Sequence, residues 1–171
     1  MREFSNQPLS LDEIGQLLWS AQGLTDPAGL RTVPSAGALY PLETHVVVGK
    51  VSETQVGVYR YVPGRHELVR EVGGDKRHDL AMAALQQSWM EAASIMVIFT
   101  IVGRRITAEY GRRGLRYAQI EVGHAAQNLA LQAVSLGMGT TMVGAFDDEA
   151  VRKLLALPEE EVPVYIIPLG R

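Results

Sequence analysis

The amino-acid sequence predicts a single domain, residues 1–171, that combines α-helices with β-strands. Its length of 171 residues is typical of one domain. Hydrophobic residues make up 47% of the chain and charged residues 20%, so a core can form. Some segments repeat apolar residues at helical spacing, whereas others are short β-branched runs typical of strands.

The composition excludes several kinds of site. The chain has no cysteine, which excludes disulfides, thiolate metal sites and cysteine nucleophiles. A formal charge of -3 gives no general attraction to nucleic acid. We find no apolar stretch of signal-peptide or membrane-spanning length, and therefore expect a cytoplasmic protein that does not enter a membrane.

The N-terminal half is expected to contain a helix, a strand and a hairpin. Ser10 can cap a helix that has an acidic first turn and ends near Gln22. The valine-rich residues 44–51 predict a strand. Two β-branched and aromatic runs flank a Pro-Gly turn and predict a hairpin of residues 56–62 and 67–72.

The C-terminal half is expected to alternate helices and strands. The expected helices are residues 75–89, 115–136 and 147–157. The expected strands are residues 92–102, 140–145 and 162–168, and a broken basic segment occupies 104–113.

The long helix at 115–136 is apolar on nearly every side. One face is formed by Leu115, Val122, Ala126, Leu129, Ala133 and Leu136. Much of the other side carries Ile120, Ala130, Leu131 and Val134. Because such a helix must be buried, we expect a homodimer that covers it, the alternative being a central helix enclosed within one monomer.

Common motifs give little support to other functions. Neither G-x-G-x-x-G nor a P-loop occurs. Glu121 and His124 have the spacing of a di-iron ligand pair, but no second pair exists, so we assign no metal site and expect a buried polar stripe. Residues 111–114, Gly-Arg-Arg-Gly, have the form of a backbone-clamping GXXG loop, so a nucleic-acid-binding or non-catalytic module stays open as an alternative.

The strongest local signal is VPSAGALYP at residues 33–41. Four small residues between two prolines make a constrained backbone with little side-chain bulk, which a planar ligand can approach closely. A simple structural turn is the alternative.

Five blocks of the sequence resemble, in order, the nitroreductase superfamily of flavin enzymes, and in particular its SagB-type branch of azoline dehydrogenases. The blocks are FSNQPLSLDEIGQLLWSAQGLT (4–25), VPSAGALYPLE (33–43), EVGHAAQNLALQAVSLGMG (121–139), MVGAFDDEAVRKLLALP (142–158) and PVYIIPLGR (163–171). The resemblance implies an α+β fold with a mixed sheet flanked by helices, and a homodimer with FMN at the subunit interface and the long helix in that interface.

The resemblance also implies roles for particular residues. Arg2 and Arg171 would hold the FMN phosphate, while Gln87 and the Val143, Gly144 and Ala145 backbone would face the flavin ring. Pro34, Ser35, Ala36 and Gly37 would line the flavin from the partner subunit. The family's N-terminal arginine run is shortened here, which makes Arg31 or an arginine between 104 and 116 a candidate additional phosphate contact. We nominate Arg112, Arg116 and Tyr117 for the substrate pocket, and no catalytic acid or base.

Two enzyme functions follow from the resemblance. The first is an FMN-dependent oxidoreductase that takes a hydride from NAD(P)H and passes electrons to a small acceptor such as a nitroaromatic or a quinone. The second is a SagB-type dehydrogenase that oxidises an azoline or another C-N substrate.

Overall fold

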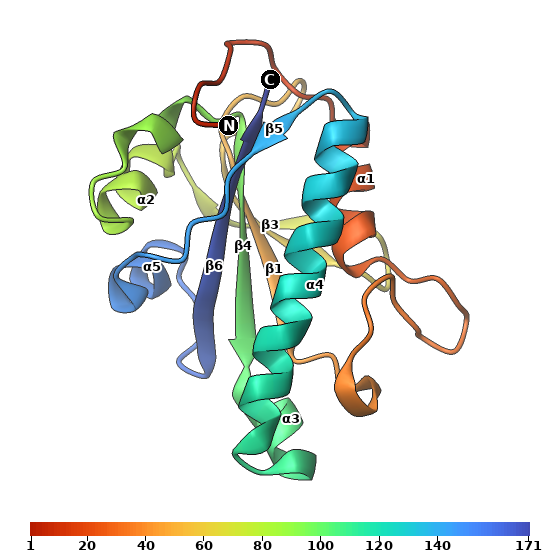
Figure 1. Ribbon diagram of the computed structural model, residues 1–171. Coiled ribbons are helices and arrows are strands. Elements are labelled where there is room, and N and C mark those ends of the chain that lie inside the picture. The colour runs from red at the N-terminus through yellow and green to blue at the C-terminus, as the bar shows by residue number, and fades with distance from the viewer.

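The computed structural model describes residues 1–171 as one six-stranded sheet with helices on both faces (Figure 1). The strands are β1 (Leu42–Val48), β2 (Gly57–Val62), β3 (Glu67–Gly73), β4 (Ile95–Val102), β5 (Gly139–Thr140) and β6 (Glu161–Gly170). Their order across the sheet is β3-β2-β1-β4-β6-β5. The α-helices are α1 (Leu11–Gln22), α2 (Arg77–Ala83), α3 (Gly103–Tyr110), α4 (Arg113–Ser135) and α5 (Asp148–Leu154). The expected α+β arrangement is confirmed.

The expectation of a mixed sheet is wrong, because all five strand pairings are antiparallel. The reason lies between β4 and β6. In the view of Figure 1, β4 runs downward and α4 returns the chain to the top of the sheet. The chain then runs downward a second time through α5, so that β6 starts at the bottom and runs upward. This second descent makes β6 antiparallel to β4.

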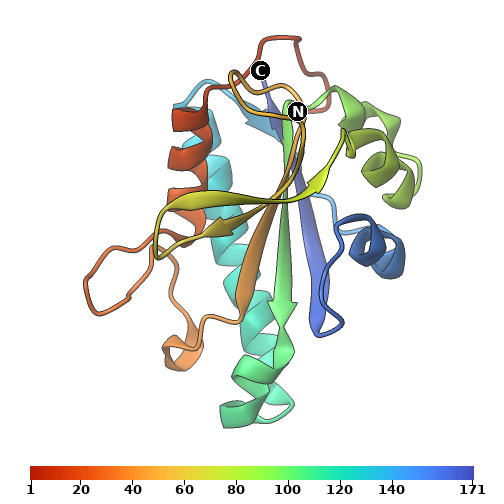
Figure 2. The same ribbon diagram turned by 180° about the vertical axis from the view of Figure 1, so that it is seen from behind.

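Helix α1 forms as the sequence predicts. The Ser10 side chain accepts from the Glu13 amide, and the Glu13 carboxylate accepts from the Ser10 amide at 2.8 Å, so the two residues form a capping box. The hairpin of β2 and β3 also matches its prediction, and it runs across to α1 (Figure 2).

Three predicted elements differ from the structure. The helix expected to reach Trp89 stops at Ala83, because Leu85 and Gln86 have left-handed backbones, with φ of 57° and 61°; a short 3-10 helix, η2 (Ser88–Ala92), follows. The basic segment expected to be broken is α3. The strand expected at 140–145 is limited to β5 and an isolated bridge between Val143 and Ile166.

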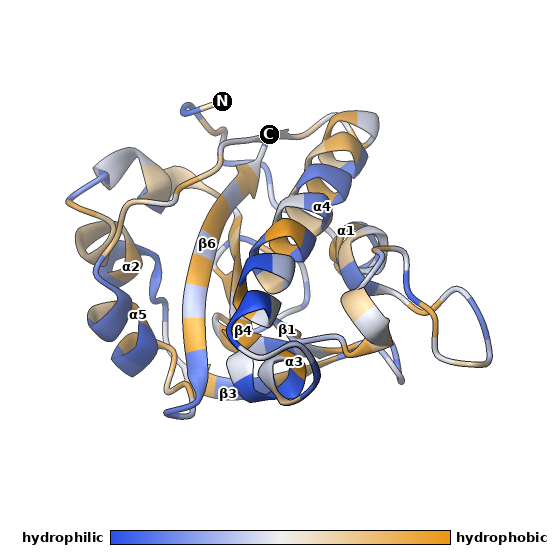
Figure 3. Cartoon of the chain, turned by 60° about the horizontal axis from the view of Figure 1, so that its bottom comes forward, coloured by the Kyte–Doolittle hydropathy of each residue, from blue (hydrophilic) through white to orange (hydrophobic).

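Two hydrophobic clusters hold the sheet to its helices. One joins α1 and α4 to one face, and the other joins α2 and α5 to the opposite face. The eight residues of β4 are all buried, as expected for a central strand covered on both faces. Figure 3 shows hydrophobic residues along the central strands and on several turns of α4. No helix has the length and apolar character required to span a membrane.

Helix α4 buries one side within the monomer and exposes apolar residues on the other. Four of the predicted face residues are at most 2% exposed: Val122, Ala126, Leu129 and Ala133. Leu115 was expected on the same face but is 44% exposed, because it lies on the first turn, beyond the edge of the sheet cluster. The exposed fractions on the far side are 49% for Ile120, 60% for Leu131 and 70% for Val134.

Candidate functional site

The first group of candidate residues, called here the terminal group, comprises Arg2, Gln87, Arg171 and the backbone of Val143, Gly144 and Ala145. The two chain termini, next to Arg2 and Arg171 in the sequence, lie at the same end of the molecule (Figure 1). The Val143 amide donates to the Ile166 carbonyl at 2.9 Å and is therefore already used in the sheet. The next two residues, Gly144 and Ala145, are exposed, and their amides donate to no other group of the chain. These two backbone donors are free for the acceptor atoms of a ligand.

Arg2 of the terminal group lies against a pair of aromatic side chains. Its guanidinium carbon is 5.3 Å from the centre of the Trp89 ring, and the Phe4 ring stacks on the same indole at 6.5 Å. The N-terminal segment is fixed by the Met1 ammonium, which donates to the Thr140 carbonyl at 2.8 Å. Arg2 forms no ion pair, so its charge is available to an anion.

Arg171 is held by a different partner. Its guanidinium pairs with the Glu13 carboxylate at the start of α1, and this hydrogen bond lowers the pKa of Glu13. In this structure Arg2 and Arg171 therefore contact different side chains, Trp89 and Glu13. An anion that uses both arginines must compete with Glu13.

Gln87 follows the two left-handed residues that end α2. Its side-chain nitrogen donates to the Ala84 carbonyl at 2.9 Å, which fixes the amide and leaves its oxygen as an acceptor. An oriented amide of this kind suits a planar heterocycle with both donors and acceptors on its edge.

The second group, residues 34–37, lies at the other end of the molecule, where η1 (Ala36–Ala38) is drawn in light orange (Figure 1). Gly37 has a φ of 62°, and a Cβ atom there would lie 2.9 Å from the Tyr110 hydroxyl. The Ser35 hydroxyl accepts from the Tyr40 amide at 2.9 Å and holds the loop closed. The small residues thus have both a structural role and an accessible backbone.

Of the three substrate-pocket candidates, only Tyr117 lies beside this loop. Tyr117 lines a cavity of about 290 Å³ together with Pro34, Ser35 and Ala36. Arg112 and Arg116 are exposed and form no ion pair. The glycines of the GXXG motif have structural roles, since Gly111 has a φ of 55° and a Cβ on Gly114 would lie 2.8 Å from the Ile106 carbonyl oxygen.

The same cavity reaches a residue that the sequence analysis assigned only to a polar stripe. Glu121 on α4 is 2% exposed, and neither carboxylate oxygen has a hydrogen-bond partner. Burial raises the pKa of Glu121 to about 7, against the nearby Ser35 hydroxyl and Arg31 guanidinium, which lower it. The signal that could have found it is that Glu121 is the only carboxylate in α4.

Arg31 extends this polar group under the loop. It donates to the Gln22 side-chain oxygen at 2.7 Å, and its guanidinium carbon is 4.4 Å from the centre of the Tyr40 ring. Burial lowers the pKa of Arg31. Within one chain, Arg31 is therefore held beneath the loop and does not lie beside Arg2.

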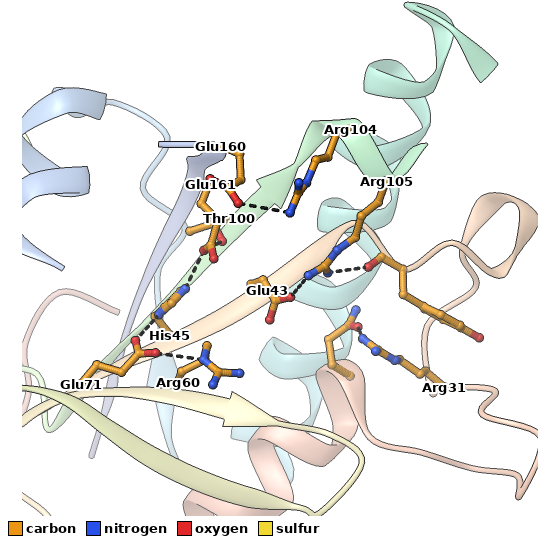
Figure 4. A network of polar contacts seen from close by, with 12 residues as sticks. Arg31, Glu43, His45, Arg60, Glu71, Thr100, Arg104, Arg105, Glu160 and Glu161 are labelled. Carbon is orange, nitrogen blue, oxygen red and sulfur yellow. Dashed lines mark hydrogen bonds and ion pairs between the residues drawn. The ribbon is translucent and has the colours of Figure 1, made fainter. Parts of the chain in front are cut away.

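A separate buried network crosses the sheet at His45 (Figure 4). His45 is 1% exposed, with Nε2 3.0 Å from Glu161 and Nδ1 3.3 Å from Glu71. Thr100 donates to the Glu161 carboxylate at 2.9 Å, and Arg60 donates to Glu71 at 2.9 Å. Burial lowers the pKa of His45, but the contacts with the two glutamates outweigh burial and raise that pKa. No predicted site residue takes part in this network.

A larger cavity of about 620 Å³ lies between α1 and the β2-β3 hairpin. Its walls include Asp12, Tyr59, Tyr61 and His66, and none of the predicted site residues. The chain contains no group of three or more histidine, aspartate or glutamate residues arranged to hold a metal ion.

Comparison with known proteins relates this geometry to one family. The model of the nitroreductase family matches residues 1–171. The nitroreductase-family protein MJ1384 of Methanocaldococcus jannaschii is 46% identical over 171 residues, which cover all of this chain and 85% of that protein. A solved nitroreductase-family structure from Anabaena variabilis has a TM-score of 0.86 and 29% identity, over 99% of this chain and 35% of that one.

Two further relatives are named for what they do. The microcin B17-processing protein McbC of Escherichia coli is 28% identical over 168 residues, covering 93% of this chain and 61% of McbC. The NADPH-flavin oxidoreductase of Vibrio harveyi is 31% identical over 112 residues, covering 60% of this chain and 46% of that enzyme. The chain belongs to the nitroreductase family, and its relatives include the microcin B17-processing protein McbC.

Proposed function

We propose that the protein is an FMN-dependent oxidoreductase that accepts a hydride from NAD(P)H and passes electrons to a small acceptor such as a nitroaromatic or a quinone. The observation that carries the proposal is the pair of free amides at Gly144 and Ala145, on a chain whose whole length matches the nitroreductase family. The NADPH-flavin oxidoreductase relative supports the flavin and the nicotinamide donor. When bound, FMN would supply the hydride-accepting and electron-donating chemistry.

The residues present fit a flavin in chemical terms. The Gly144 and Ala145 amides would donate to acceptor atoms of the flavin ring, where hydrogen bonds to developing negative charge are most valuable. Gln87 would bind the polar edge of the ring through its fixed amide. Arg2 would hold the phosphate, and Arg171 would join it by leaving Glu13.

We also propose that the working form is a homodimer. Val143 pairs with β6, whereas η1, which includes Ala36 and Gly37, lies on the other side of α4 from that strand (Figure 1). One copy therefore does not bring both groups around one ligand. The exposed apolar side of α4 is available to a second copy. Each flavin would then lie between the terminal group of one subunit and residues 34–37 of its partner. A cytoplasmic location stays a prediction.

The test is anaerobic addition of NADH or NADPH to the FMN-loaded protein. Loss of the oxidised flavin absorbance, followed by its return when a quinone or nitroaromatic is added, is the expected result. Flavin that stays oxidised under excess NADH and NADPH would contradict the reductase proposal. Reduction by an azoline instead would favour the second candidate, a SagB-type dehydrogenase, which the similarity to McbC supports.

A further inference from the structure

Unpaired buried polar atoms are concentrated beneath the 33–41 loop. Five buried side-chain nitrogen and oxygen atoms have no hydrogen-bond partner, and four of them belong to Gln22, Arg31 and Glu121. Two of the four are the carboxylate oxygens of Glu121, which also contacts the cavity under the loop. An unpaired buried carboxylate is costly, and its cost depends on its protonation state.

The loop above Glu121 has an unusual backbone. Gly37, Ala38 and Tyr40 have φ values of 62°, 52° and 45°, and two of these residues are not glycine. Such conformations persist only where surrounding contacts fix them. Here Ser35 supplies a contact, because its oxygen accepts from the Tyr40 amide, and Ser35 and Glu121 line the same cavity under the loop.

We propose that Glu121 is a positioning residue that couples protonation of its buried carboxyl group to the conformation of the 33–41 loop, so that FMN binding against this loop takes up a proton. The inference rests on the proposed function, since it requires flavin to cover the loop. A ligand on the loop removes water from the cavity side of Glu121. Further shielding from water favours the neutral carboxyl group, which must then bind a proton.

Other charged and titratable groups face the same region. Arg31 and Tyr40 come from the segment that includes the loop. The charges of the Arg105-Glu43 pair, from α3 and β1, also act on the pKa of Arg31. Helix α4 itself contributes Tyr117 and His124 to the cavity wall. His124 is the matched comparison for Glu121, because it lies on the same helix and lines the same cavity.

The test measures proton uptake when FMN binds to flavin-free protein. Calorimetric titrations at about pH 7, in buffers of different ionisation enthalpy, give the number of protons taken up. We expect greater uptake by the unmodified protein than by Glu121→Gln, and unchanged uptake for the matched control His124→Asn. The FMN phosphate, which ionises near pH 6, contributes equally to all variants and cancels in the difference. The affinity of the unmodified protein should also fall with pH more steeply than that of Glu121→Gln, by up to about tenfold per pH unit.

The outcomes separate the two proposals. Equal proton uptake by the unmodified protein and Glu121→Gln, both binding FMN, overturns the coupling and leaves the proposed function standing. Loss of the uptake in His124→Asn alone assigns it to His124 and also overturns the proposal. If no form binds FMN at any pH, the proposed function fails and the coupling fails with it. Should Glu121→Gln not fold, Glu121→Asp moves the carboxyl group away from Ser35, and the pH of maximal uptake should shift.

Discussion

At the scale of single residues, the buried carboxyl group of Glu121 should make stability depend on pH. Its pKa of about 7 in the folded chain lies above the ordinary value of 4.5. Between these values the folded state binds more protons than the unfolded state, so the free energy of unfolding should decrease as pH rises, by roughly 3 kcal/mol at most. Urea denaturation at about pH 5 and about pH 8 measures the decrease. Glu121→Gln should lack this component; an equal decrease in both proteins would contradict the assignment.

His45 should be essential to the stability of the sheet for a different reason. His45→Ala leaves the buried Glu161 carboxylate without its cation, while Glu71 keeps Arg60, and this should cost about 3 to 5 kcal/mol. The exposed Arg104-Glu160 pair is the matched control, and Arg104→Ala should cost less than about 1 kcal/mol. Urea denaturation of both variants distinguishes them. Equal costs would show that burial of the His45 network contributes nothing.

The same network sets a pH window. The pKa values of both glutamates are lowered. The nearby His45 lowers the pKa of Glu71, and the His45 interactions lower the pKa of Glu161 more than burial raises it. Their contribution is present above the ordinary value of 4.5 and is lost as pH falls through the lowered values. The raised pKa of His45 contributes fully below 6.5 and is lost as pH rises through the raised value. The network therefore stabilises the fold most between these limits.

At the scale of elements, α4 has two sides with different functions. Leu129 is fully buried against the sheet, so Leu129→Ala should destabilise the fold by about 2 to 5 kcal/mol. Val134 is 70% exposed, and Val134→Asp should leave the stability of the monomer nearly unchanged while weakening association of two copies. Urea denaturation and light scattering measure the two effects. A Val134→Asp protein with the oligomeric state of the unmodified protein would remove this side of α4 from the interface.

At the scale of the whole molecule, a site shared between two copies predicts complementation. Arg171→Ala removes the Arg171 side chain from the terminal group. Pro34→Glu places bulk and charge on the exposed loop of residues 34–37. A heterodimer of one chain of each variant should have one site with both defects and one intact site. FMN titration of the purified heterodimer should therefore find one tight site per two chains, whereas each variant alone should bind weakly. A heterodimer with no tight site would show that each chain builds its site alone.

The sequence by itself determined the elements whose signals are local. The Ser10 cap, the Pro-Gly hairpin turn and the apolar run of β4 each depend on neighbours in sequence, and all three formed as predicted. The five ordered blocks likewise predicted the family. The early end of α2 had a weak local signal, because Leu85 and Gln86 are not residues that ordinarily favour left-handed backbones.

Only the tertiary structure decided which side chains meet. The family resemblance implied a common role for Arg2 and Arg171, yet Trp89 and Glu13 engage them separately. The two polar residues of the Glu121-x-x-His124 spacing differ sharply in environment, since Glu121 is enclosed beneath the loop while His124 is exposed. Protonation and partner choice depend on burial by segments far apart in the chain, and burial of that kind is a property of packing rather than of sequence order.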